Sequence, residues 1–190
     1  MFVSEEIPVS LSDEELLRDF ARAKTRERAF RQLVEKYQAR VYGHIRSMVI
    51  DHDTADDLTQ DTFVKVWKKL DTFRQQSKLF TWIYRIATNE SLQYLRKKRR
   101  RFLLPIHDLT QEQEAQLHAD PLLAGDEVQR KLQQALIRLP DKQRLVFNMK
   151  YFEEMKYKEI SEVLGTSVGA LKASYHLAVK KIEHYLSENE

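Results

Sequence analysis

One stretch of the sequence combines an aromatic ring, cations and amides at the spacing of a single helix face. Five residues three or four positions apart carry these groups: Trp82, Arg85, Asn89, Gln93 and Arg96. Bases stack on aromatic rings while Arg and Lys follow phosphates, so this composition is typical of a platform for single-stranded nucleic acid. The opposite face holds Leu79, Ile83, Ile86 and Ala87. These four suffice to bury the helix, although a core position for Trp82 is the alternative, because tryptophans are usually largely buried.

A second candidate site lies near the C-terminus, where two short apolar stripes meet at a glycine. The first stripe is Ile160, Val163 and Leu164, and the second is Leu171, Tyr175, Ala178 and Ile182. Gly165, between them, suits the left-handed conformation that ends a helix, and Ser167 can cap the next helix. The spacing fits a helix-turn-helix, whose second helix enters the major groove of DNA.

The outward positions of that second helix can meet base edges or phosphates if Leu171 and Tyr175 face the core. These positions are Lys172, Ala173, His176 and Lys180. Lys172 and His176 are the best candidates to contact base edges, although Lys cannot form the bidentate hydrogen bonds that Arg makes with guanine. The alternative is an ordinary helical hairpin with a solvated basic face.

Charge is segregated along the chain, although the net charge is only +3. Residues 96–101 are six consecutive cations, whereas residues 102–129 contain six acids and no Lys or Arg. A run of like charges is either a solvated helix end or a binding patch for a polyanion, and its neighbours decide between the two.

A cluster of acids suggests a different chemistry, that of a helical metal-dependent hydrolase. The cluster consists of Asp51, His52, Asp53, Asp56, Asp57 and Asp61. Helical metal sites need inward-facing His and carboxylates on several helices, and none of the six His pairs with another at a ligand spacing. We favour the alternative that these acids cap a helix and face its positive end. Since no Cys is present to bind zinc or act as a nucleophile, the sequence predicts no catalytic residue, metal or cofactor.

Helices are predicted to carry the first candidate site in an N-terminal domain. The first helix runs from Asp13 to Ala23, with Ser12 as its N-cap and Glu15 completing a capping box. The second covers 27–48, where apolar residues recur every three or four positions.

Two further helices complete this domain. The third begins at Asp53 or Thr54 and ends near Asp71. A loop over 73–78 follows, and the fourth helix then runs from Phe80 into the basic cluster.

The second half of the chain begins after a segment with the composition of a flexible linker. Residues 103–125 are polar and acidic and contain Pro105, Pro121 and Gly125. A helix over 128–139 follows, Pro140 stops it, and Asp141 can cap the next helix. That helix is expected to pack on its predecessor through Leu145, Val146, Met149 and Phe152. The fold class is therefore all-α, with two small helical domains joined by a flexible linker, the C-terminal one containing the helix-turn-helix.

Neither a secretory signal nor a membrane span is expected. The first twelve residues are acidic where a signal peptide begins with cations. No stretch approaches the roughly 18 apolar residues that a membrane helix needs. We therefore expect a cytoplasmic protein.

Several motifs together resemble the extracytoplasmic-function (group IV) sigma factors of RNA polymerase. DDLTQD at 56–61, VW at 66–67, DTFR at 71–74 and TWIYRIATN at 81–89 resemble region 2 of that family. LP at 139–140 and the helix-turn-helix resemble region 4. The resemblance divides the chain into region 2 over 10–101, an acidic linker over 102–125 and region 4 over 126–190.

The resemblance implies an initiation factor rather than an enzyme. Asp57, Gln60 and Asp61 would dock on the clamp helices of the largest polymerase subunit. Region 4 would meet the flap of the second-largest subunit. An anti-sigma protein is a further implied partner.

The resemblance also implies how promoter DNA is bound. The loop over 74–78, including Lys78, and the helix after it would hold the melted downstream element, with Trp82, Asn89 and Gln93 on its face. Arg85, Arg96 and Lys97 would contact phosphates. The helix from Ser167 would read the upstream element as duplex through the outward positions named above.

One departure from the family pattern concerns this last helix. Ala173, Ser174, Leu177 and Val179 stand where the family often has cations or larger polar groups. The recognised sequence therefore does not follow from the resemblance.

A one-component transcriptional regulator is an alternative kind of DNA-binding protein. Its N-terminal helices would sense a ligand, and its C-terminal motif would bind an operator. Such a regulator binds duplex DNA without polymerase, whereas a small sigma factor binds weakly alone. A gel-shift assay with and without core enzyme separates the two.

The linker carries a testable hypothesis. Because it has acids and no cations, we hypothesise that it threads a basic polymerase channel otherwise used by RNA. Replacing Asp108, Glu112, Glu114 and Asp120 with Lys should weaken holoenzyme formation and change abortive initiation. Unchanged values of both quantities would show that the idea is wrong.

Overall fold

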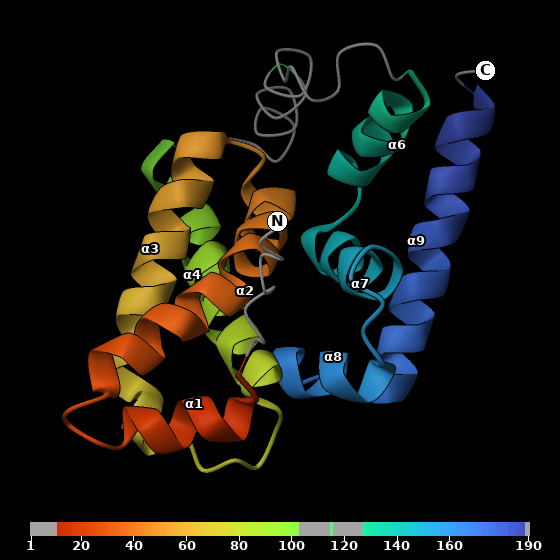
Figure 1. The fold of residues 1–190 in the computed structure, drawn as a ribbon. Coiled ribbons are helices and arrows are strands. Elements are labelled where there is room, and N and C mark those ends of the chain that lie inside the picture. The colour runs from red at the N-terminus through yellow and green to blue at the C-terminus, as the bar shows by residue number, and fades with distance from the viewer. Residues whose placement is uncertain (1–10, 103–114, 116–126, 189–190) are drawn as a thin grey trace, which may run out of the picture.

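The computed structural model describes residues 11–102, 115 and 127–188, and the regular elements in these ranges are all helices. The N-terminal half contains α1 (Asp13–Phe20), α2 (Arg26–Val49), α3 (His52–Lys69), a 3-10 turn (Leu70–Thr72) and α4 (Leu79–Phe102). The C-terminal half contains α6 (Glu127–Ile137), α7 (Asp141–Tyr151), α8 (Tyr157–Leu164) and α9 (Val168–Glu188). The all-α prediction is confirmed. Figure 1 shows the two halves side by side, with α8 reaching across to α4.

The start of α1 follows the predicted capping box. The backbone N–H of Glu15 donates to Ser12 Oγ at 3.2 Å, and the N–H of Ser12 donates to Glu15 Oε2 at 2.9 Å. The helix ends at Phe20 rather than Ala23, and the hydroxyl of Thr25 donates to the carbonyl of Asp19 at 2.7 Å. This early end turns the chain so that Phe20 packs edge-on against Trp67 of α3.

The start of α3 differs from the prediction. Asp51, not Asp53 or Thr54, is the N-cap, and its carboxylate accepts the backbone N–H of Thr54 at 2.8 Å. Hydrogen bonds from the side chain and then from the backbone N–H of Thr54 lower the pKa of Asp51, because they favour the charged carboxylate. Asp51, Asp53 and Thr54 can each cap a helix, but only Asp51 precedes the first helical residue, His52.

A core between α2, α3 and α4 holds these helices in place. Most of the apolar face of α2 is buried, and Val41 and Ile45 are fully enclosed. Val66 of α3 and Ile83 of α4 meet them in the same cluster. The faces of α3 and α4 that carry the candidate binding residues are therefore the faces left outside this core.

The packing of α7 corrects the sequence analysis. Every residue from Arg144 to Met149 is buried, so α7 is enclosed on two sides. Leu145, Val146 and Met149 do not pack mainly on α6, as expected, but join the core of the N-terminal half. Phe147 instead packs with the residues of α6, whereas Phe152 is 48% exposed. A helix buried on two sides shows no single apolar stripe, which is why its partner was misassigned.

The predictions for the start of α7 and for the end of α8 have different outcomes. Pro140 occupies the N-cap position of α7 and Asp141 is the first helical residue, so Asp141 does not cap the helix as expected. Gly165 follows α8 in the left-handed conformation (φ 60°, ψ 32°), as predicted, and its N–H donates to the carbonyl of Ser161 at 2.9 Å.

The predicted linker over 102–125 lies almost wholly outside the described residues. None of the helices that the structure describes has both the length and the apolar composition of a membrane span.

The turn at Gly165 gives a stability prediction with an internal control. A Cβ added at Gly165 or at Gly43 in α2 would meet no atom within 4 Å, so only backbone conformation distinguishes the two sites. Gly165→Ala should lower the free energy of unfolding by about 1–2 kcal/mol, because a left-handed conformation is strained for alanine. Gly43→Ala should raise it by about 0.5–1 kcal/mol, because alanine favours a helix interior. Urea denaturation measures both, and changes of the same sign would contradict the assignment.

Candidate nucleic-acid and polymerase interfaces

The face of α4 that carries the predicted strand platform lies at the surface. Arg85, Asn89 and Gln93 are exposed, as are Arg96 and Lys97. Trp82 is partly buried: it packs against the edge of the core, with its ring centroid 5.2 Å from that of Phe73. The indole is thus neither free of the core nor enclosed by it. One edge is anchored while part of the ring remains accessible.

Two of the predicted DNA-binding cations are bonded to the other half of the protein. Lys78 Nζ donates to Glu159 Oε1 of α8 at 2.7 Å. This hydrogen bond raises the pKa of Lys78 and lowers that of Glu159, whose carboxylate also accepts the backbone N–H of Lys156. Arg85 donates to the backbone carbonyl of Glu162. α8 therefore contacts the same face of α4 that the sequence predicts for DNA.

Farther along α4 the same face borders a cavity of about 420 Å³. Arg96 and Arg99 line it from α4, while Asp141, Leu164 and Thr166 line it from the C-terminal half. Arg99 forms an ion pair with Asp141. The carboxylate of Asp141, predicted to cap α7, thus pairs with a cation of the other half.

The second helix of the helix-turn-helix is α9. Ser167 Oγ accepts the backbone N–H of Ala170 at 3.4 Å, a weak version of the predicted cap. Leu171 and Ala178 are fully buried, and the ring of Tyr175 stacks on Phe147 with centroids 5.6 Å apart. The four outward positions predicted for DNA contact are all exposed: Lys172, Ala173, His176 and Lys180. They form one solvent-facing side of α9.

The three residues predicted to bind polymerase lie on the exposed side of α3. Asp57 and Asp61 face solvent, and Gln60 lines a groove of about 500 Å³ between α2 and α3. The other groove residues are largely apolar: Phe30, Val34, Phe63, Val64 and Trp67, with Gln38 and Thr59. Val64 is 50% exposed. An apolar groove beside exposed carboxylates suits a partner helix that carries both apolar and basic side chains.

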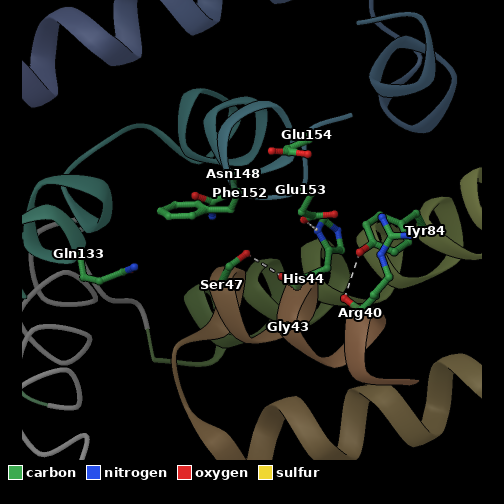
Figure 2. Close-up of a pocket in the computed structure, with 10 residues that line it drawn as sticks. All are labelled: Arg40, Gly43, His44, Ser47, Tyr84, Gln133, Asn148, Phe152, Glu153 and Glu154. Atoms are coloured by element: carbon green, nitrogen blue, oxygen red, sulfur yellow. Dashed lines mark hydrogen bonds and ion pairs between the residues drawn. The ribbon is translucent and has the colours of Figure 1, made fainter. Parts of the chain in front are cut away.

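Sequence reasoning missed the polar contacts that join the two halves. Figure 2 shows His44 of α2 directed at Glu153, which follows α7, and His44 Nδ1 lies 2.9 Å from Glu153 Oε1. Arg144 is 5% exposed and donates to the carbonyl of Met48 at 3.1 Å. One feature of the sequence could have indicated that Arg144 is buried. It lies in a short helix with Leu145, Val146, Phe147 and Met149, which are more apolar residues than one buried face requires.

Two residues of the cluster considered for a metal site have other partners in the structure. Asp51 caps α3, and His52 Nδ1 lies 2.6 Å from the hydroxyl of Tyr42. Among the described residues, no group of three or more His, Asp or Glu side chains is placed to hold a metal ion.

Both halves match described protein families. Residues 33–101 match Sigma-70 region 2, and residues 129–182 match Sigma-70, region 4. The two matches occur in the order expected from the sequence.

Two bacterial relatives match along most of their length. The chain is 33% identical over 156 residues to the ECF RNA polymerase sigma factor SigW of Bacillus subtilis, which covers 78% of this chain and 83% of that protein. It is 31% identical over 170 residues to the RNA polymerase sigma-H factor of Pseudomonas aeruginosa, covering 84% and 87%.

Solved structures agree with this assignment. CnrH, solved in complex with the cytosolic domain of CnrY, is 26% identical, with a TM-score of 0.69 and coverage of 94% of this chain and 99% of that one. The sigma factor RpoE, solved with the anti-sigma factor NepR from Bartonella quintana, shares the fold at 23% identity, with a TM-score of 0.67 and coverage of 85% and 98%. The chain therefore belongs to the extracytoplasmic-function sigma factors, which direct RNA polymerase in transcription initiation.

Proposed function

We propose that this sigma factor divides promoter recognition between its halves, with α4 holding an unpaired strand, α9 reading duplex DNA and α3 docking on polymerase. The observation that carries the proposal is the placement of three separate helix surfaces outside the helix cores, each with the chemistry of one of these targets.

Strand capture by α4 is supported by the neighbourhood of Trp82. Its ring is anchored against Phe73 and stays partly accessible, so a base can stack on it without first ordering the side chain. Stacking on such a ring contributes about 1–3 kcal/mol per base. Asn89 and Gln93 offer amides to base edges, and Lys78, Arg85, Arg96 and Lys97 supply positive charge for phosphates.

Duplex readout by α9 is supported by the geometry of the helix-turn-helix. Gly165 lets α8 end sharply, and the buried Leu171 fixes the rotation of α9 about its axis. Lys172 and His176 then share the outward side with Ala173 and Lys180. A helix presented this way fits the major groove, where each base pair shows a distinct pattern of hydrogen-bond donors and acceptors.

Docking on the polymerase is supported by the groove between α2 and α3. We propose that a clamp helix of the largest subunit lies along it, with apolar side chains against Val64 and basic ones beside Asp57 and Asp61. Gln60 would bond at the rim. The C-terminal half would meet the flap of the second-largest subunit.

Regulation by an anti-sigma protein is part of the proposal. Two of the solved relatives are in complexes, one with an anti-sigma factor and one with the cytosolic domain of CnrY. We propose that this chain, too, acts in the cytoplasm under such a partner. It needs no cofactor, because polymerase performs the chemistry.

One transcription experiment tests the division of labour. Core polymerase plus this protein transcribes genomic DNA, sequencing of RNA 5′ ends maps its promoters, and the strongest promoter becomes the template. Trp82→Ala should bind core normally but form open complexes about tenfold less well, as expected from the loss of one stacked base. Asp61→Lys should weaken core binding. Each holoenzyme that still forms should open the promoter as efficiently as the wild-type holoenzyme.

Each variant is a control for the other, and Trp82→Phe separates stacking from folding. Phenylalanine keeps a ring against Phe73, so it should restore most of the activity at an unchanged melting temperature. A promoter whose downstream element is already unpaired should partly rescue Trp82→Ala. The proposal is wrong if purified core and wild-type protein open no promoter, or if Trp82→Ala is as active as wild type.

A further inference from the structure

An exposed leucine lies on the side of α9 that we expect to face duplex DNA. Leu177 is 48% exposed, whereas Leu171, Ala178 and Ile182 of the same helix are buried. Successive residues of a helix are about 100° apart around its axis, so Leu177 points about 120° away from the direction that these three share. Ala173 is also exposed and precedes Leu177 by one helical turn. The two side chains therefore form a short apolar strip on the outward side of α9.

Cations border this apolar strip on both sides. Lys172 lies at one edge of the outward side and Lys181 at the opposite edge, and both are exposed. The Nζ atom of Lys172 lies 5.9 Å from the centre of the Tyr157 ring, which keeps this ammonium beside α8. The major groove has the complementary pattern, because its base edges lie between two negatively charged backbones. The outward side of α9 thus matches the groove in charge as well as in shape.

The rotation of α9 about its axis keeps Leu177 outside the core. Leu171 is fully buried near one end of the helix, and Ile182 is buried farther along. Between them, the ring of Tyr175 stacks on that of Phe147. These three contacts fix which side of α9 faces outward, so a DNA duplex on that side meets the leucine directly.

The chemistry of leucine restricts what it can recognise in the groove. Its side chain has no hydrogen-bond donor or acceptor, so it cannot read the polar atoms of a base edge. The 5-methyl group of thymine is the apolar group that base edges present in the major groove, and apolar side chains contact it. An exposed leucine between cations therefore suits a thymine rather than a guanine.

We propose that Leu177 is a specificity-determining residue of α9 and contacts the 5-methyl group of a thymine in the upstream promoter element. The proposal rests on the duplex-reading role proposed above for α9. It adds the chemical group that is read and the side chain that reads it. Lys172 and Lys181 then lie towards the phosphates on either side of that base pair.

Replacement of thymine by deoxyuridine tests the contact, because uracil lacks only the 5-methyl group and pairs as thymine does. The probes are duplex fragments of the mapped promoter in which each thymine of the upstream element, on either strand, is replaced in turn. Holoenzyme with the wild-type factor is titrated into each labelled fragment, and fluorescence anisotropy gives the dissociation constant. At one or two positions uracil should weaken binding about three- to fivefold, the range expected when one methyl group loses its apolar contact.

The variant Leu177→Ala tests the protein side of the same contact. Its holoenzyme should bind the unmodified promoter about three- to tenfold more weakly and lose nothing further when uracil replaces the contacted thymine. Its melting temperature should match that of the wild type, because the side chain lies at the surface. Val128→Ala is the matched control: it shortens an aliphatic side chain of α6 that is 77% exposed, and it should keep the full effect of uracil.

Two results overturn the inference and leave the proposed function standing. One is that no single uracil weakens binding of the wild-type holoenzyme although a scrambled upstream element does. The other is that uracil weakens the wild-type and Leu177→Ala holoenzymes equally. If scrambling the upstream element does not weaken binding of the wild type, the duplex-reading role of α9 fails, and the inference fails with it.

Selection from a promoter library with a randomised upstream element gives an independent measurement. The wild-type holoenzyme should enrich thymine at the position that the uracil experiment identifies. Leu177→Arg should lose this enrichment and favour guanine at that position or at a neighbouring one, because a guanidinium donates two hydrogen bonds to guanine O6 and N7. The same base preferences for both proteins at every position would contradict readout by Leu177.

Discussion

A cation enclosed between two helical cores governs how the halves of this sigma factor meet. Burial of a guanidinium costs several kcal/mol unless partners compensate it. Arg144 finds its partners in the carbonyl of Met48, from the other half, and in Asp141 of its own helix at 3.8 Å. The bond to Met48 ties α7 to the C-terminal end of α2. The contacts of Asp141 with Arg99 and of Glu159 with Lys78 follow from that placement.

Local patterns in the sequence predicted the elements well. The capping box at Ser12, the left-handed Gly165 and the alternation of buried and outward residues along α9 each depend on a few neighbouring residues, and the structure agrees with all three. The platform on α4 could be proposed because ring, amides and cations repeat at helical spacing. The platform lies at the surface because the core occupies the opposite side of α4. That buried side was predicted from the apolar residues of the helix.

What the sequence could not give were contacts between distant residues. His44 lies 109 positions from Glu153, and nothing around either residue indicates the other. The partner of α7 was misassigned for a related reason, because a helix enclosed by two cores has no single apolar side to read. Trp82 was weighed as either core or platform, and its intermediate burial reflects the position of Phe73, which lies outside α4.

The two-sided burial of α7 also limits the separated form. When the halves part, Leu145, Val146 and Met149 lose their cover on one side while Phe147 keeps its own. A contiguous apolar patch on a water-exposed helix invites association or proteolysis. Any partner that engages the separated halves, polymerase included, must therefore cover this side of α7 or leave it open to association and cleavage.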